Sequence, residues 1–258
     1  ARFMNAGFWF NGRNFEMVLD ALDMGSNYYA DMGFVQRIEN YDQERDSIIR
    51  LGFRHLFSEM HYRIFPEESK TINNHRFTFE NFIVWNPDGS FNERFNRLQY
   101  ELSFLNTSGI ALGLGNNEID LMFPFSFTDA DPLLAKRYHN YRIYLGYESD
   151  ERKIFNYEIE AERWFSFYDG SLTSFSFSLR YRKQPWGNFR LDFEYNNLKF
   201  EAPYGESELF LISPRIEVNF SRNLFWTTFL QFNTQGIILI STADFSGVFL
   251  QCQIYLSF

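Results

Sequence analysis

The stretch from Ser171 to Phe200 alternates apolar and polar side chains twice, with a turn between the two runs. Every second position is aromatic or aliphatic: Phe175, Phe177, Leu179 and Tyr181, then Phe189, Leu191, Phe193 and Tyr195. This period of two predicts a hairpin of two strands joined by a turn at 184–188. A soluble sheet would bury the apolar face in a core, whereas a membrane barrel would turn it toward lipid. The hairpin alone leaves both architectures open.

The composition favours the membrane barrel. The chain has 33 Phe, 15 Tyr and 5 Trp, so aromatic residues make up 21% of its 258 residues, yet its mean hydropathy is -0.34. Strands of outer-membrane barrels combine these two properties, because each strand has lipid-facing rings on one side and polar residues on the other. The alternative is a soluble β-sandwich, in which the same alternation would cover a protein core.

Several classes of protein are excluded. The longest apolar run, Gly236 to Ile240, is far shorter than the ~18 to 20 residues of a spanning helix, which excludes a helical membrane protein. A single cysteine, Cys252, excludes an internal disulfide. The net charge of -9 argues against nucleic acid as a partner, since nucleic acid would need a basic surface. No signal-peptide pattern follows Ala1, so we interpret the sequence as a mature or truncated product.

Alternating segments recur along the chain. Six of them follow one another between Tyr138 and Gln235, each about ten residues long, with short and longer connections in turn. Two strong turn signals, Asn11-Gly12-Arg13 and Asn86-Pro87-Asp88-Gly89, separate further strands nearer the N-terminus. This arrangement is typical of an up-and-down barrel.

We therefore predict an all-β fold, an antiparallel up-and-down transmembrane β-barrel of about 14 strands, within a range of roughly 12 to 16. Residues 1–258 are expected to form a single outer-membrane barrel domain, closed or nearly closed. Residues 25–42 are expected to form a long loop and residues 107–127 one strand, while residues 48–66 fit either one very long strand or two shorter ones.

The polar faces of the predicted strands collect charged side chains of both signs. In a barrel these faces line the lumen, and opposite charges on neighbouring strands predict ion pairs across it. The candidate lumen-lining residues are Arg142, Glu158, Glu160, Arg180, Arg182, Arg190, Asp192, Glu194, Arg215 and Glu217. In the alternative, these residues form the solvated outer face of a soluble sheet.

No pattern of catalytic or metal-binding residues stands out. His55, His61, His75 and His139 lack metal-ligand spacing, so we expect them at an interface or in the lumen. Glu158 and Glu160 share one face and resemble a glycosidase pair, but lumen charge explains them better. His139, with a Ser or Asp neighbour, is the one candidate for a hydrolase site. We predict that the chain is not an enzyme and has no cofactor and no metal site.

Five segments carry a resemblance to a known family: Asn140 to Ile143, Leu145 to Asp150, Tyr181 and Arg182 with Gln184 to Asn188, Ile212 to Val218, and Ser221 to Gln235. They resemble the C-terminal region of domain-of-unknown-function family 5916, outer-membrane-type barrels of Bacteroidota-like bacteria. The resemblance begins at about Asn5 and is most specific between Tyr141 and Gln235.

Many members of that family carry an N-terminal carbohydrate-binding module similar to family 9, which this sequence lacks. The resemblance implies that the chain is the C-terminal part of a larger protein in the bacterial outer membrane. The implied partners are outer-membrane lipid, other outer-membrane or surface proteins, and carbohydrate through the missing module.

After Gln235 the chain departs from the family, which continues with Asn-x-Asn-Ser-Arg-x-Gln-Trp-Arg and then Ser-Asp-Leu-Phe. A one-nucleotide shift of the back-translated tail permits that ending, so we interpret residues 236–258 as atypical and frame-shifted. Residues 237–240 are consecutive apolar residues, and half of them would point into a polar lumen. We therefore expect the last two strands to be short, irregular or weakly paired, with a poorly closed barrel.

These observations favour a non-enzymatic outer-membrane β-barrel, either a pore or a surface platform linked to carbohydrate binding or uptake. A soluble ligand-binding β-barrel or sandwich is the first alternative, and an outer-membrane hydrolase is the second.

Overall fold

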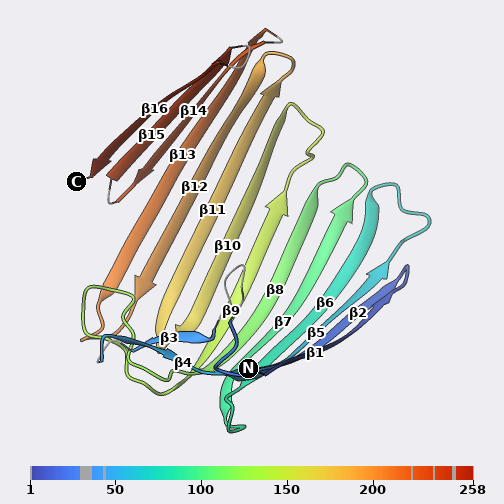
Figure 1. Ribbon diagram of the computed structural model, residues 1–258. Coiled ribbons are helices and arrows are strands. Elements are labelled where there is room, and N and C mark those ends of the chain that lie inside the picture. The colour runs from blue at the N-terminus through green and yellow to red at the C-terminus, as the bar shows by residue number, and fades with distance from the viewer. Residues whose placement is uncertain are drawn as a thin grey trace.

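The chain folds into one large, curved antiparallel sheet with a small two-stranded sheet beside it (Figure 1). The computed structural model describes residues 2–29, 37–42, 45–221, 223–234, 236–245 and 248–257. The large sheet has 14 strands in the order β1-β2-β5-β6-β7-β8-β9-β10-β11-β12-β13-β14-β15-β16. This confirms the predicted all-β, antiparallel, up-and-down fold, because chain neighbours pair throughout except where β3 and β4 intervene.

The strands of the large sheet are between 9 and 16 residues long, the length that crosses a bilayer at a tilt. They are β1 (Phe3–Asn11), β2 (Phe15–Met24), β5 (Phe53–Ile64), β6 (Ile72–Trp85), β7 (Phe91–Phe104), β8 (Gly109–Asp120), β9 (Arg137–Glu148), β10 (Phe155–Phe167), β11 (Gly170–Lys183), β12 (Gly187–Lys199), β13 (Glu206–Ser221), β14 (Leu224–Asn233), β15 (Gly236–Phe245) and β16 (Val248–Ser257). The small sheet pairs β3 (Glu39–Asp42) with β4 (Ser47–Arg50).

The predicted hairpin from Ser171 to Phe200 is β11 and β12. Its register is unbroken, and Phe177 lies directly opposite Phe193, just as Leu179 lies opposite Leu191. The six alternating segments predicted in this half of the chain are β9 to β14. Strand prediction succeeded here because apolar and polar side chains alternate along most of each strand, although the otherwise polar face of β14 also carries Phe225 and Phe229.

Two local predictions were wrong, and a third had left two alternatives open. Residues 25–42 are not all loop, because β3 falls within them and pairs with β4. The predicted strand over 107–127 is too long, since β8 ends at Asp120 and only an isolated bridge joins Phe125 to Leu133. Of the two alternatives for residues 48–66, two strands are correct. Leu51 and Gly52 separate β4 from β5, and a Cβ on Gly52 would lie 2.5 Å from the carbonyl oxygen of Met24.

The two ends of the large sheet carry connections of different length. One end, called the loop end, holds the connections 25–52, 121–136 and 200–205. The opposite end, called the turn end, holds shorter connections such as 12–14, 105–108 and 184–186. In Figure 1 the small sheet of β3 and β4 lies at the loop end, at the bottom of the view.

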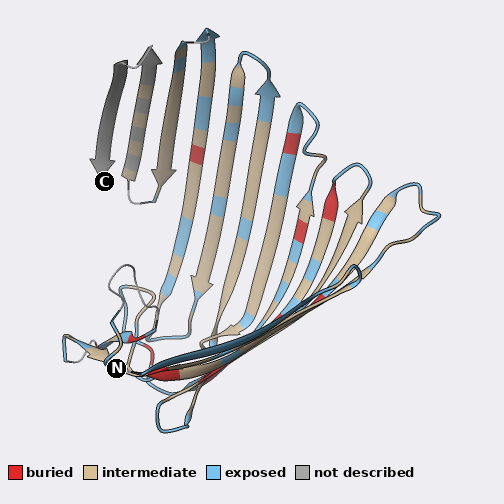
Figure 2. Cartoon of the chain, turned by 45° about the vertical axis from the view of Figure 1, so that its right-hand side comes forward, coloured by how far each residue is buried: buried red, intermediate tan, exposed pale blue. Residues whose placement is uncertain are grey.

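Two segments fold over the loop end, and together they are called the cap: the described residues 37–42 and 45–50, and residues 121–136. In the first, Ile38 is buried against Met24, Phe53 and Val84. In the second, Phe127 contacts four rings that come from its own segment, the β10–β11 turn and the β12–β13 connection: Phe125, Phe167, Tyr168 and Phe200. The first cluster holds four of the seven buried apolar side chains of the described residues, and Figure 2 shows that little of the large sheet is buried.

The tail pairs more regularly than predicted. β15 pairs with β14 and with β16 over all ten of its residues, without a bulge, so the expectation of irregular or weakly paired last strands is wrong for the backbone. In the described part of the chain, β1 pairs only with β2 and β16 only with β15. The sheet therefore has two free edges here, and the closed seam of the predicted barrel is not formed.

Candidate membrane-facing surface and inner polar face

All ten predicted lumen residues lie on one face of the large sheet. Side chains alternate along a strand, and residues directly opposite one another on paired strands share a face. Applied to the registers of β9 to β13, this rule places the ten residues together on what is called the inner face. The cap lies on this same face, since Ile38 packs against inner-face Val84. Phe175 and Phe177 belong to the opposite, outer face.

The outer face is apolar and uncovered. Five aliphatic side chains on its central strands, β7 to β9, are between 46% and 60% exposed: Leu98, Leu112, Leu114, Ile143 and Leu145. No second layer covers them within the described part of the chain, whose core contains only seven buried hydrophobic residues. Monomeric soluble proteins rarely expose a contiguous apolar surface of this kind. The outer face is therefore the candidate lipid-facing surface of this sheet.

A row of polar side chains bounds the apolar surface toward the loop end. On β6, β7 and β8, Asn81 donates to Asn96 at 2.6 Å and Asn96 donates to Asn116 at 3.3 Å. The three asparagines lie directly opposite one another on the outer face. Amide side chains that satisfy one another in this way are suited to the boundary between lipid and water.

The row continues across the other half of the sheet. On β10 and β11, Arg163 donates to Thr173, and the register then leads to Asn197 on β12 and Glu208 on β13. Tyr195 joins this part of the row, because its hydroxyl donates to Glu208 at 2.6 Å and accepts from Asn197 at 3.0 Å. This set is called the polar belt: Asn81, Asn96, Asn116, Arg163, Thr173, Asn197 and Glu208.

The height of the apolar surface matches a bilayer. On β11 the outer face is apolar from Phe175 to Tyr181, between Thr173 of the polar belt and Lys183 ten residues later. Ten residues of strand span ~33 Å, and a tilt of about 40° reduces this to a height of ~25 Å, the usual height of the apolar band of an outer-membrane barrel.

Aromatic residues gather on the outer face near the turn end. Tyr62, Phe77 and Tyr100 lie opposite one another on β5, β6 and β7. Further along the sheet, Tyr181 lies opposite both Phe155 and Phe189. Aromatic girdles of this kind mark the interfaces of membrane barrels. His75 lies here too and bonds the Tyr100 hydroxyl at 2.8 Å, as expected for an interface histidine.

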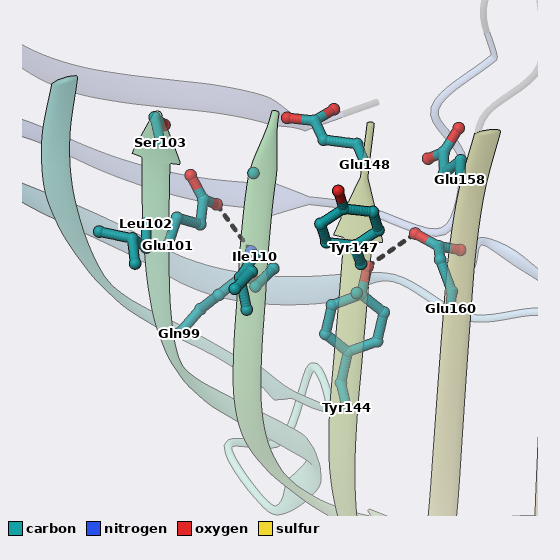
Figure 3. A pocket seen from close by; sticks show the side chains of 13 residues that line it. Gln99, Glu101, Leu102, Ser103, Ile110, Tyr144, Tyr147, Glu148, Glu158 and Glu160 are labelled. Atoms are coloured by element: carbon teal, nitrogen blue, oxygen red, sulfur yellow. Dashed lines mark hydrogen bonds between the residues drawn. The ribbon is translucent and has the colours of Figure 1, made fainter. Parts of the chain in front are cut away.

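One half of the inner face is acidic. A pocket of about 260 Å³ near the turn end is lined by Glu101, Glu148, Glu158 and Glu160, among others (Figure 3). Tyr144 donates to Glu160 at 2.6 Å, and Figure 3 shows its hydroxyl group pointing toward that carboxylate. Glu160 thus accepts hydrogen bonds from the hydroxyls of Tyr144 and Ser176, on the two neighbouring strands.

Small residues on β8 make room for this half of the inner face. Its four inner positions nearest the turn end are Gly109, Ala111, Gly113 and Gly115. A Cβ on Gly115 would lie 2.6 Å from Nε of Arg142, and one on Gly109 would lie 2.7 Å from Oε1 of Glu148. Side chains of β9 therefore lean across β8, as expected where strand glycines permit close approach. Arg142 thereby reaches the ring of Phe95 on β7 while it pairs with Glu162 at 2.8 Å.

A network of charges on β5, β6 and β7 was missed by the sequence analysis. Arg97 pairs with Glu80 at 2.6 Å and with Glu59 at 3.7 Å. Beside them, Arg76 contacts the ring of His61 at 3.1 Å. His61, expected at an interface or in the lumen, lies on the inner face, and His55 lies there as well, 3.0 Å from Asp20.

The other half of the inner face, on β11 to β13, contains most of the arginines among the predicted residues. Arg180, Arg190 and Arg215 lie directly opposite one another, while Arg182 donates to the carbonyl of Glu151 in the turn. Only part of the predicted ion pairing crosses between strands. Arg142–Glu162 and Arg180–Glu158 do so, the latter at 4.0 Å, but Arg190–Asp192 and Arg215–Glu217 are pairs within one strand.

The hydrolase candidate is not supported by geometry. His139 lies on the outer face of β9, opposite Glu118. Its serine neighbour, Ser166, donates to the carbonyl oxygen of His139 at 2.7 Å rather than to its imidazole ring. Among the described residues, no three His, Cys, Asp or Glu side chains are grouped to hold a metal ion, and none of the chain described forms a helix fit to cross a membrane.

Comparison with known proteins gives no relative. The chain matches no protein-family model, no curated protein and no solved structure. The resemblance to domain-of-unknown-function family 5916 therefore stays a prediction.

Lys136 ties the cap to the β10–β11 turn, because its Nζ lies 2.5 Å from Asp169. This carboxylate raises the pKa of Lys136 above its ordinary value. A raised lysine pKa stabilises the fold fully below the unfolded-state pKa of about 10.4, and the stabilisation is lost as pH rises through the folded-state pKa. Both groups are exposed, so the expected contribution is below about 1 kcal/mol. Between pH 9 and pH 12, the rate of limited proteolysis within residues 121–136 should increase slightly more in the unchanged chain than in Asp169→Asn. An equal increase in both would contradict a stabilising Lys136–Asp169 contact.

Proposed function

We propose that this chain is a non-enzymatic β-barrel of the bacterial outer membrane whose inner face lines a water-filled pore. The observation that carries the proposal is the outer face, an uncovered apolar surface bounded by the polar belt toward one end and by aromatic residues toward the other. Outer-membrane barrels have this sequence of bands on the side that contacts lipid. Outer-membrane lipid is then the principal partner.

The inner face supports a pore rather than a packed core. Its side chains are charged, and they are held by neighbours on the same wall, such as Glu160 by Tyr144 and Arg97 by Glu80. A lumen with acidic side chains on β7 to β10 and arginines on β11 to β13 would act on the charge of passing solutes.

The two free edges must be covered in the membrane. Unpaired backbone groups cost several kcal/mol each in lipid, so an open sheet does not cross a bilayer by itself. We propose that the edges of β1 and β16 are joined to each other or to further strands of a longer chain, in line with the family resemblance. Long loops of such barrels face the exterior, which places the cap outside the cell.

Conductance tests the pore. In planar bilayers the purified chain should open channels, and Arg180→Ala and Arg190→Ala should each shift the reversal potential toward cation selectivity, because each removes a lumen cation. Arg94→Ala is the matched control, since Arg94 is an exposed arginine on the outer face of β7. Channels that respond equally to all three changes, or no channels at all, would contradict the proposal.

A surface platform is the second candidate, and the cap favours it. The cap covers part of the loop end and encloses, with β5 to β8, a cavity of about 330 Å³. If the chain inserts in membranes without conducting, and a bound surface partner is retained after Arg180→Ala and Arg190→Ala, the platform replaces the pore. The carbohydrate link belongs to this candidate through the implied N-terminal module.

A further inference from the structure

Three arginines form a straight row across the inner face. Arg180 on β11 lies opposite Arg190 on β12, and Arg190 lies opposite Arg215 on β13. Neighbouring strands are ~4.8 Å apart, so the three side chains leave the sheet along a line of ~10 Å. Like charges directly opposite each other destabilise a sheet. A row of three therefore needs compensation by negative charge.

The carboxylates nearby compensate only part of the row. Asp192 contacts Nε of Arg190 at 2.7 Å, and Glu217 contacts one terminal nitrogen of Arg215 at 2.7 Å. Glu158 stays 4.0 Å from Arg180, beyond hydrogen-bond distance. Each guanidinium has five N–H donors, so these contacts engage a minority of the donors in the row.

The donors that remain are open to water. The side chains of Arg180, Arg190 and Arg215 are 42%, 46% and 53% exposed. The row thus combines concentrated positive charge with unused donors on a chain whose net charge is -9.

We propose that Arg180, Arg190 and Arg215 form a binding site for small solutes that carry phosphate-type oxyanions. The planar guanidinium matches the oxygens of such groups with two parallel hydrogen bonds, which a spherical anion such as chloride cannot accept. The length of the row fits two linked groups better than one, so a diphosphate binds more tightly than a single phosphate.

This inference deepens the proposed pore, since it names the class of solute that the lumen binds, but it requires only that the inner face is open to water. The test is therefore made in detergent, without conductance. Isothermal titration with inorganic pyrophosphate, inorganic phosphate and chloride at constant ionic strength should give saturable binding in that order of affinity, with no saturation by chloride.

Two variants locate the site. Arg190→Gln removes the central guanidinium and should weaken pyrophosphate binding at least about tenfold, because it removes a bidentate charge-assisted contact. Arg190→Lys keeps the charge without the planar guanidinium, so its affinity for pyrophosphate should lie between that of the unchanged chain and that of Arg190→Gln. Arg94→Gln, which removes the same charge from the outer face, should change the affinity less than about twofold.

The outcomes separate this site from the pore. Absence of saturable pyrophosphate binding, or equal affinity in Arg190→Gln and Arg94→Gln, overturns the site even if the chain conducts. Binding that depends on Arg190 in a chain that does not conduct overturns the pore and leaves the site. If Arg190→Gln fails to fold, as judged by circular dichroism and heat-modifiable gel mobility, Arg190→Lys decides, and an unweakened Arg190→Lys then overturns the site.

Discussion

Phe177→Arg should destabilise the chain in lipid vesicles by about 2 to 4 kcal/mol, the cost of an arginine at the lipid-facing midplane of a barrel. Phe177 lies near the middle of the outer face of β11, between Thr173 of the polar belt and Lys183 at the turn end. The guanidinium of the introduced arginine would have to leave water or deform the bilayer. The free energy of unfolding, from urea titration in vesicles with gel mobility as readout, measures the cost.

Two controls make this result specific. Ser178→Arg adds the same side chain one residue later, on the inner face and directly opposite the carboxylates of Glu158 and Asp192, and should cost less than about 1 kcal/mol. Thr173→Arg places it in the polar belt, where the cost should fall to about 0 to 1 kcal/mol. If the outer face were in contact with water instead of lipid, Phe177 would be a surface residue and the change would have an effect within about 0.5 kcal/mol. Equal costs for Phe177→Arg and Ser178→Arg would therefore contradict the membrane-facing surface.

The C-terminal half of the fold could be predicted from the sequence because its alternation is nearly uninterrupted. In β11 and β12 every apolar residue from Phe175 to Phe189 falls at an outer-face position, so strand, register and face follow from one pattern. The ten candidate residues shared a face for the same reason. Their partners did not follow, since whether Arg190 pairs with its own strand or with a neighbour depends on rotamers and not on the period.

The N-terminal half resisted prediction for two physical reasons. On β6 the inner face carries apolar residues near the loop end, such as Val84, because the cap packs on it there, so the alternation breaks. The charge network of Arg97 and Glu80 was overlooked for this reason. The polar belt could not be seen either, because Asn81, Asn96 and Asn116 become neighbours only once the registers of three strands are known.

Residues 236–258 show that a break in the alternation does not prevent strand pairing. Their run of apolar residues predicted poor pairing, yet the backbone of β15 pairs fully, because hydrogen bonds between strands do not depend on which face a side chain takes. The prediction about faces is confirmed, as the register places Ile238 and Ile240 on the inner face. Two apolar side chains on a polar face make its solvation less favourable, but they do not prevent the strand from pairing.

Arg97→Met should destabilise the chain by about 2 kcal/mol, less than the ~3 to 5 kcal/mol found for fully buried ion pairs, because the residues involved keep some contact with water. Arg97 lies between Glu59 and Glu80, which are directly opposite each other on β5 and β6. Its removal leaves two partly buried carboxylates side by side without a counter-charge. Urea titration in vesicles measures the loss.

The reason for the loss can be tested separately from the loss itself. Adding Glu80→Gln to Arg97→Met removes one of the two opposed charges, so the double variant should recover about half of the lost stability, a coupling that residues in contact show and distant ones do not. Arg94→Met, three residues away on the outer face, should change stability by less than about 0.5 kcal/mol. A double variant no more stable than Arg97→Met would mean that Arg97 acts through the packing of its aliphatic stem and not through its charge. The inner face would then be stabilised by van der Waals contact, and its charged side chains would be available to bind the solute.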